Sequence, residues 1–340
     1  MSRLYNVAVL GATGAVGKVI VSILAERDFP LGNIYALASK RSEGTRINFE
    51  GDELVVQAVD NFDFSKADIG LFSAGAGVSA RYAPKAAAAG CVVIDNTSEF
   101  RYNADIPLVV PEVNPETINQ YKARGIIANP NCSTIQMVVA LKPLYDAVGI
   151  ERVNVSTYQA VSGTGKRAIS ELEGQSTALL NCRPTSCSVY PKQIAFNVLP
   201  HIDVFLENGY TKEEMKMVWE TRKIMTDDDL QVNPTAVRVP VFYGHSEALH
   251  IETREFIDAD RAREILQSAP GVMVIDERKD GGYPTAATEA AGTDAVYVGR
   301  IRNDISHPRG LDMWVVSDNL RKGAALNSVQ VAEILIRDYL

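Results

Sequence analysis

The chain has 340 residues, 46% of them hydrophobic, and carries a formal net charge of −8 at pH 7. This length and composition allow a sizeable core and favour two domains. The acidic balance without a basic cluster argues against nucleic acid or a membrane surface as partner, and the apolar runs are too short for a transmembrane helix. The 4 cysteines form no CxxC pair and, with 4 histidines, give no zinc spacing. We therefore expect no metal site, no secretory leader and a cytoplasmic location.

A strand followed by a glycine turn and a helix opens the chain. Residues 6–10 have the pattern of a buried parallel strand, and Gly11-Ala-Thr-Gly-Ala-Val-Gly17 follows at once. This order is the context of a dinucleotide-binding fingerprint. Gly11 allows the tight turn, Gly14 lets the backbone approach a pyrophosphate, and Gly17 lets helix and strand pack closely. The spacing is GxxGxxG rather than GxGxxG, so a structural turn without a ligand stays open as an alternative.

The second expected strand, 33–38, indicates which nicotinamide cofactor binds. An NAD site usually places Asp or Glu near its end to bind the ribose 2′-hydroxyl. This chain has Ser39-Lys-Arg-Ser42 there instead. Two cations and two hydroxyls suit a 2′-phosphate, which points to NADP, whereas a solvated charged loop is the alternative.

Further strands of the same sheet are expected at 68–73, 91–95 and 125–128. Ligands of open parallel sheets bind at the carboxyl ends of the strands. The glycine turn, Arg101 and Cys132 all follow such ends. The sequence therefore predicts one crevice that holds a cofactor, a cation and a nucleophile.

Cys132 lies in Asn129-Pro-Asn-Cys-Ser-Thr-Ile135, just before an amphipathic run over 135–144. Ser133 or Thr134 is expected to cap that helix, which places Cys132 at or beside its N-terminus. Unpaired N–H groups and the positive end of the helix dipole favour a thiolate there. The alternative is that Cys132 is a small buried hydrophobe.

From about residue 150 strands follow one another through short turns, so a mixed or antiparallel sheet is predicted. The expected strands are 152–161, 235–243, 247–256, 295–301 and 311–317, and the expected helices are 165–181, 211–226 and 324–340. The fold class is thus α/β, with a Rossmann-type N-terminal domain of mostly parallel strands and an α+β mixed-sheet substrate domain.

Several residues of the second half have the character of site residues. His245 is expected in a turn between two strands, where an imidazole can reach a cleft and titrate near neutrality. Arg238 lies on the opposite strand face from its valine neighbours and only seven residues before His245. The alternatives are a surface histidine and a sheet-surface arginine. The segment 158–166 ends a strand in a Gly-rich loop, which suits a phosphate or nicotinamide contact.

Thr211-Lys-Glu-Glu-Met-Lys216 predicts a helix start, because Thr211 and Glu214 have the spacing of a capping box. Glu213 and Lys216 are three residues apart and should share a helix face. By itself such a pair is an ordinary surface feature.

Together these segments resemble the aspartate-semialdehyde dehydrogenase family in its bacterial form. The resemblance covers nearly the whole chain and is carried, in order, by GATGAVG at 11–17, SEFR, NPNCST, QAVSGTGK, EEMK, RVPV followed by GHSE, and SDNLRKGAA at 317–325. It implies NADPH-dependent reductive dephosphorylation of L-aspartyl 4-phosphate to L-aspartate 4-semialdehyde through a cysteine thioester, in lysine, threonine and methionine biosynthesis. It also implies a homodimer joined through the substrate domain.

The resemblance also implies the role of each matching residue. Cys132 would be the nucleophile and His245 the acid/base. Substrate and phosphate would be bound by Arg101, Asn131, Gln159, Glu213, Lys216 and Arg238. NADP would be bound by Gly11, Thr13, Gly14, Ala15, Val16, Arg41, Ser42, Ser162, Gly163 and Asn319. The domains would be 1–130 for NADP, 131–316 for substrate, catalysis and dimerisation, and 317–340 as a helix returning to the nucleotide domain.

Other functions remain open at this stage. N-acetyl-γ-glutamyl-phosphate reductase runs the same reaction type on a longer, acylated substrate, but Glu213 and Arg238 argue for a free α-amino acid and Asn131 favours the aspartyl enzyme. A glyceraldehyde-phosphate-type dehydrogenase would need a second phosphate site. A non-catalytic NADP-binding relative predicts loss of Cys132 or His245, and both are present. A cysteine hydrolase would leave the glycine turn without a role.

Overall fold

The computed structural model of the chain describes residues 3–340, and the contacts divide them into two compact units. Unit 1 runs to Asn131 and includes Ala324–Leu340, whereas unit 2 is Cys132–Gly323. The sequence placed these divisions at 130/131 and 316/317. No helix of the described part is long and apolar enough to cross a membrane.

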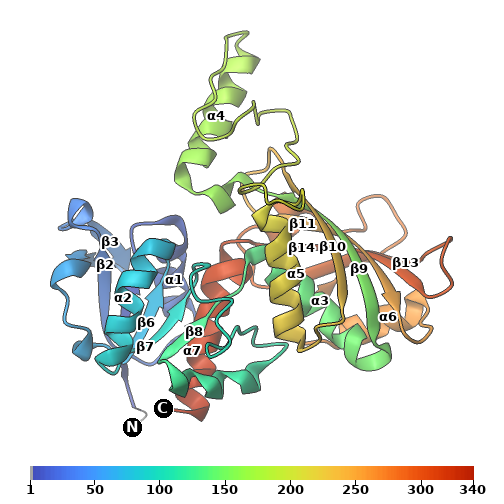
Figure 1. The fold of residues 1–340 in the computed structure, drawn as a ribbon. Coiled ribbons are helices and arrows are strands. Elements are labelled where there is room, and N and C mark those ends of the chain that lie inside the picture. The colour runs from blue at the N-terminus through green and yellow to red at the C-terminus, as the bar shows by residue number, and fades with distance from the viewer. Residues whose placement is uncertain (1–2) are drawn as a thin grey trace. The chain divides into compact units, whose positions relative to one another are not determined.

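Six parallel strands form the sheet of unit 1 in the order β5-β2-β1-β6-β7-β8 (Figure 1). They are β1 (Tyr5–Leu10), β2 (Leu31–Ala38), β5 (Gln57–Ala58), β6 (Ile69–Phe72), β7 (Val92–Asp95) and β8 (Ile126–Ala128). All five strands predicted for this sheet are present. Strand order reverses on either side of β1, which is the position where open parallel sheets bind ligands.

Helices cover the sheet of unit 1. α1 (Ala15–Glu26) and α7 (Leu326–Asp338) share one hydrophobic core with the strands, to which α1 contributes Ile20 and Leu24 and α7 contributes Val329 and Leu335. α2 (Ala76–Ala88) packs on β6 and β7. The α1 crossover runs from β1 to β2 and the α2 crossover runs from β6 to β7, in opposite directions along the sheet, so right-handed connections place α1 and α2 on opposite faces. A hairpin of β3 (Arg46–Phe49) and β4 (Asp52–Val55), which the sequence analysis did not predict, completes the unit.

Unit 2 contains the predicted mixed sheet, in the order β10-β9-β11-β14-β13-β12. Its strands are β9 (Ile150–Gln159), β10 (Gln231–Arg238), β11 (His245–Thr253), β12 (Val272–Val274), β13 (Val296–Asn303) and β14 (Gly310–Ser317). The pairs β9–β10 and β12–β13 are parallel, and the other three are antiparallel. The fold class predicted from the sequence is therefore confirmed.

α3 (Cys132–Val148), α5 (Lys212–Met225) and α6 (Ala259–Gln267) pack against this sheet, and α4 (Lys166–Leu180) projects from it (Figure 1). α6 and β12 were not predicted. Side chains alternate along β11, with His245, Glu247 and Leu249 buried. The opposite face of the sheet, with Ser156 and His250 among its residues, lines a shallow cavity of about 440 Å³.

Candidate active site

Unit 1 has a cavity of about 420 Å³ at the carboxyl ends of β1, β2 and β6. Its lining includes Gly11, Thr13 and Gly14 of the glycine turn, and Arg41 and Ser42 after β2. The glycine turn and the cationic loop, which the sequence assigned to the pyrophosphate and to the 2′-phosphate of one dinucleotide, thus line the same cavity. Ala15 and Val16 are the first residues of α1.

The backbone of the glycine turn leaves no room for side chains at two positions. Gly11 has φ +92°, and a Cβ there would lie 2.9 Å from the carbonyl carbon of Ser73. A Cβ at Gly17 would lie 2.1 Å from the Gly11 oxygen, which explains the close packing of helix on strand. α1 has Gly14 as N-cap, without a side-chain capping bond, and no acidic residue in its first turn. Its first N–H groups therefore suit the pyrophosphate of a dinucleotide.

Three cavity residues on α2, Val78, Arg81 and Tyr82, were missed by the sequence analysis. Arg81 forms an ion pair with Asp60 at 3.1 Å, and the Tyr82 hydroxyl donates a hydrogen bond to Asp60. Val78, Arg81 and Tyr82 of α2 have the spacing i, i+3, i+4 and so share one helix face. That spacing, at the start of a helix that follows a strand end, is the signal that could have identified them.

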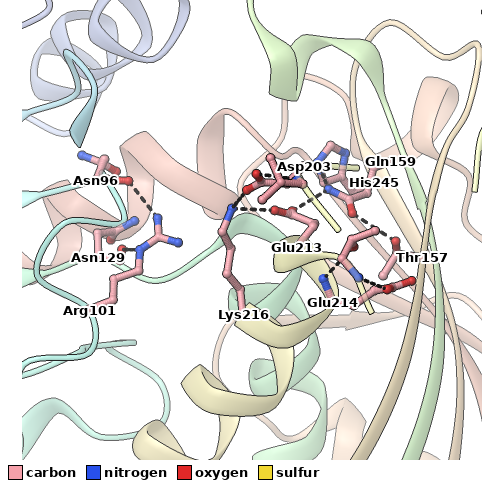
Figure 2. Close-up of polar contacts among 12 residues, drawn as sticks. Asn96, Arg101, Asn129, Thr157, Gln159, Asp203, Glu213, Glu214, Lys216 and His245 are labelled. Carbon is pink, nitrogen blue, oxygen red and sulfur yellow. Dashed lines mark hydrogen bonds and ion pairs between the residues drawn. The ribbon is translucent and has the colours of Figure 1, made fainter. Parts of the chain in front are cut away.

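Arg101 is buried in unit 1, where backbone carbonyls hold its guanidinium (Figure 2). Nε donates to the Asn129 oxygen at 2.9 Å, and Nη2 donates to the Asn96 oxygen at 2.9 Å. Asn96 directly follows β7 and Asn129 directly follows β8. Arg101 is thus anchored at the carboxyl ends of two neighbouring strands, as the sequence predicted. Asn131, the last residue of this part of unit 1, is also buried.

Cys132 is the first residue of α3 and is partly exposed. The N-terminal position predicted for Cys132 is confirmed, but the predicted cap is wrong. Ser133 and Thr134 lie inside the first turn of the helix, and both are buried. A Cβ at Gly323 would lie 2.9 Å from the Cys132 Cβ, so a larger residue there would displace the cysteine.

His245 is the first residue of β11 and is fully buried, so the predicted turn and the predicted titration near neutrality are wrong. Its Nδ1 accepts a hydrogen bond from the Ala160 N–H at 3.0 Å. The ring proton of the neutral imidazole must therefore lie on Nε2. Burial, reinforced by the nearby charge of Arg238, lowers the pKa of His245 to about 3.

Gln159, the last residue of β9, has its amide orientation fixed by two hydrogen bonds (Figure 2). Thr157 Oγ1 donates to Gln159 Oε1 at 3.1 Å, and Gln159 Nε2 donates to Glu213 Oε1 at 3.1 Å. Gln159 Nε2 and His245 Nε2 are 3.5 Å apart. Both nitrogens carry protons, so they cannot bond to each other but can share an acceptor oxygen.

The start of α5 confirms the predicted capping box. Thr211 Oγ1 accepts from the Glu214 N–H at 3.3 Å, and Glu214 Oε2 accepts from the Thr211 N–H at 2.7 Å. Glu213 and Lys216 share a helix face as expected, with Lys216 Nζ 2.9 Å from Glu213 Oε2.

Lys216 Nζ also lies 2.8 Å from Asp203 Oδ2 (Figure 2). Burial alone would lower the pKa of Lys216, but the two carboxylates raise it. Asp203 was missed, because it lies in an irregular segment without a recognisable pattern.

Arg238 ends β10 and is buried, rather than exposed on the sheet surface. Nη1 donates to the Ala160 oxygen at 2.7 Å, whereas Nε has no hydrogen-bond partner among residues 3–340. A Cβ at Gly163 would lie 3.2 Å from Arg238 Nη1 and 3.4 Å from His245 Nε2. Arg238, His245 and the Gly163 backbone therefore meet.

Asn319 and Ser162 lie at the edge of the same cluster. Asn319 Oδ1 accepts from Ser162 Oγ at 3.0 Å and from the Gly244 N–H at 2.9 Å. Within the described chain, the buried Asn319 Nδ2 has no hydrogen-bond partner. A buried donor in this state is suited to a ligand oxygen. Among residues 3–340 no group of three or more His, Cys, Asp or Glu side chains could hold a metal ion.

Two family matches define the class of the protein. Residues 6–121 match the family described as semialdehyde dehydrogenase, NAD binding domain, and residues 141–322 match semialdehyde dehydrogenase, dimerisation domain. The chain is therefore a pyridine-nucleotide-binding oxidoreductase of the semialdehyde dehydrogenase class, with a dimerisation domain.

Full-length relatives define the class more narrowly. The chain is 63% identical over 339 residues to the aspartate-semialdehyde dehydrogenase of Shewanella violacea, with 100% of both covered, and 64% identical over 340 residues to that of Legionella pneumophila, covering 100% of this chain and 98% of the relative. The solved structure of aspartate semialdehyde dehydrogenase II of Vibrio cholerae complexed with ASA has a TM-score of 0.98 at 58% identity, with 100% of both chains covered. The chain belongs to the aspartate-semialdehyde dehydrogenase family, as the resemblance predicted.

Proposed function

We propose that the protein reduces L-aspartyl 4-phosphate with NADPH to L-aspartate 4-semialdehyde and phosphate, as a step of amino-acid biosynthesis. The observation that carries this proposal is the buried cluster of unit 2, where two N–H donors, Gln159 and His245, lie 3.5 Å apart. Arg238 adds a positive charge that suits the α-carboxylate of an amino acid, and Glu213 adds a negative charge that suits its amino group. The Vibrio cholerae relative was solved with ASA bound.

Cys132 is the proposed nucleophile. An acyl phosphate accepts hydride poorly, so covalent catalysis divides the reaction into two easier steps. A bond forms between sulfur and the acyl carbon, while the bond to the phosphate oxygen breaks and phosphate leaves with the electron pair. When bound, a reduced nicotinamide would supply hydride to the carbonyl carbon of this thioester. When the resulting thiohemiacetal collapses, the electron pair of the sulfur–carbon bond returns to sulfur and the aldehyde leaves.

His245 is proposed to act as a neutral N–H donor. With Nδ1 occupied by the Ala160 N–H, Nε2 presents a proton to the substrate. That proton and the second N–H of the Gln159 amide can hold the carbonyl oxygen as negative charge develops on it. Donors fixed in advance in a buried site are a large source of transition-state stabilisation.

The remaining substrate residues are proposed from their charges and the family resemblance. Arg238 binds the α-carboxylate, because a planar guanidinium can bind a carboxylate bidentately. Glu213 binds the amino group. Lys216 and Arg101 are assigned the phosphate, and Asn131 a substrate contact.

NADP is the proposed cofactor, because Arg41 and Ser42 line the unit 1 cavity and no acidic residue stands between Ser39 and Ser42. Gly11, Thr13, Gly14, Ala15 and Val16 are proposed to hold the pyrophosphate region. Ser162, Gly163 and Asn319 are the proposed contacts from unit 2. A more distant relative, at 27% identity and a TM-score of 0.76, was solved with NADP from Candida albicans.

A homodimer is the proposed assembly. The family match to a dimerisation domain covers the mixed sheet of unit 2. The sheet face with the cavity of about 440 Å³ carries Asn154, Ser156, His250, Asp312 and Trp314. A second copy placed against this face would cover these polar and aromatic side chains. The proposed chemistry also needs a reduced thiol at Cys132, which a reducing cytoplasm maintains.

A phosphate-dependent assay of NADP reduction tests the proposed function. We expect turnover with aspartate semialdehyde and little with N-acetylglutamate semialdehyde. Activity with only the second substrate would identify an N-acetyl-γ-glutamyl-phosphate reductase. NADP binding without turnover of either substrate would favour a non-catalytic relative.

A further inference from the structure

Glu247 is a buried carboxyl group for which the proposed reaction has no role. It lies on β11 two residues after His245, so both side chains point to the same face of the sheet. Its side chain is fully buried, and neither carboxyl oxygen has a hydrogen-bond partner in the described part of the chain. An ionised carboxylate in such a place is strongly disfavoured.

The strands beside Glu247 offer no compensating charge. Its paired neighbours are Thr157 on β9 and Val315 on β14. Thr157 donates its hydroxyl proton to Gln159, and Val315 has none to donate. By strand register, the neighbours of Glu247 and His245 on this face are Thr157, Gln159, Val315 and Ser317, all uncharged, and His245 itself is neutral. From α3, the side chain that acts on Glu247 is the amide of Gln136, which is also uncharged.

Gln136 of α3 has one unsatisfied donor that complements the Glu247 carboxyl group. Its Oε1 accepts from Ser317 Oγ at 2.8 Å, but its Nε2 has no hydrogen-bond partner within residues 3–340. Burial raises the pKa of Glu247 well above its usual range, against the opposing effect of the Gln136 amide. Gln136 follows Cys132 by four residues and so lies on the same side of α3.

We propose that Glu247 is a neutral carboxylic acid that pairs with the Gln136 amide and thereby positions the first turn of α3, with Cys132, relative to His245 on β11. The acid O–H donates to Gln136 Oε1, which has a second lone pair beside Ser317, and Gln136 Nε2 donates to the acid carbonyl. This cyclic pair satisfies the three groups left without partners. Glu247 is thus a positioning residue, and this role rests on the proposed functions of Cys132 and His245.

The proton is essential to this arrangement. An ionised Glu247 would lose the bond to Gln136 Oε1 and place a negative charge beside Gln136, which follows Cys132 by one turn of α3. A glutamine at position 247 can form the same cyclic pair without a proton to lose. Glu247→Gln is therefore the conservative variant, and Glu247→Leu removes the pair.

The first test is a double-variant cycle measured on the full-length enzyme. Glu247→Gln should keep kcat within about threefold, whereas Glu247→Leu and Gln136→Leu should each lower it by about 10²-fold, the effect of a small misplacement of the reacting groups. The kcat of the double Leu variant should be no lower than that of either single variant, because both substitutions remove the same hydrogen-bonded pair. Glu252→Gln, on the other face of β11, is the matched control. Losses that multiply in the double variant, or a Glu247→Gln enzyme as impaired as Glu247→Leu, would overturn the proposal.

The second test needs no substrate and so separates this proposal from the proposed function. The pH dependence of Cys132 alkylation by iodoacetamide should be unchanged in Glu247→Gln and altered in Glu247→Leu. Urea unfolding should show the wild type losing stability relative to Glu247→Gln as pH rises above about 4.3, because the folded state keeps a proton that the unfolded state releases. Parallel stability profiles of these two proteins between pH 5 and 8 would show an ionised carboxylate and overturn the proposal, even if Glu247→Leu fails to fold.

Discussion

The nucleotide cavity of unit 1 and the polar cluster of unit 2 differ in how far their polar side chains are exposed to water. In the cavity, the side chains of the Arg81–Asp60 ion pair are 61% and 46% exposed. In the cluster, Gln159, Arg238 and His245 are at most 4% exposed. Water screens the charges of the exposed ion pair, whereas backbone groups and other side chains hold the buried polar groups of the cluster in place. Substitutions should therefore have modest effects in the cavity and large effects in the cluster.

The largest effect is expected at the nucleophile. Cys132→Ala should lower turnover by at least about 10⁴-fold, because no other group can form the covalent intermediate. Calorimetry should show NADPH binding close to that of the wild type. Cys182→Ala removes an exposed thiol and serves as the control. Substantial turnover by Cys132→Ala would mean that hydride reaches the acyl phosphate directly.

Arg238→Lys tests the buried cluster through its guanidinium. Loss of the planar fork should lower kcat/KM for aspartate semialdehyde by about 10- to 100-fold, because a charge-assisted bidentate pair is lost. The KM for phosphate should change little. Steady-state kinetics with each substrate varied in turn measures both, and Arg152→Lys, at a half-exposed position, is the control. Unchanged kinetics would assign Arg238 to structure alone.

Arg41→Ala tests the open cavity. The Kd for NADP should rise about 10-fold while the Kd for NAD stays constant, because only NADP has the 2′-phosphate that the cation binds. Isothermal calorimetry measures both constants. Arg46→Ala removes an exposed arginine of β3 that is paired with Glu53 and should change neither. An equal loss for both cofactors would show that Arg41 does not recognise the 2′-phosphate.

The smallest effect concerns the pH dependence of stability at His245. Its folded pKa of about 3 lies below the unfolded value of about 6.5, so the unfolded state binds more protons between these values. Stability should therefore fall as pH drops from about 6.5, and His245→Gln should reduce this slope. Urea unfolding at several pH values measures it. This change of stability with pH is opposite in direction to the one expected at Glu247, so the two variants check each other. An unchanged slope in His245→Gln would contradict a neutral buried imidazole.

The same two regions show what the sequence could reveal. The glycine turn and the capping box were correctly predicted, because each depends on residues a few positions apart whose backbone geometry is a local property. The cap of α3 was predicted wrongly because Ser133 and Thr134 are favoured capping residues, yet both are buried within the first turn.

Long-range contacts set the chemical state of the buried residues. His245 is neutral because Ala160, 85 residues earlier, donates to its ring and because the fold buries it. Asp203 reaches Lys216 across 13 residues of irregular chain and α5, and no spacing rule identifies it. Residue types were therefore recognisable from the sequence, whereas protonation states and orientations required the sheet register.

Mass spectrometry of acid-quenched enzyme tests the central claim, the covalent attachment of substrate to Cys132, most directly. Enzyme mixed with aspartate semialdehyde and NADP without phosphate should accumulate an aspartyl thioester, and peptide mapping should place it on Cys132. Added phosphate should discharge it. Reduction of NADP with no adduct, or an adduct on Cys91, Cys182 or Cys187 instead, would contradict this account.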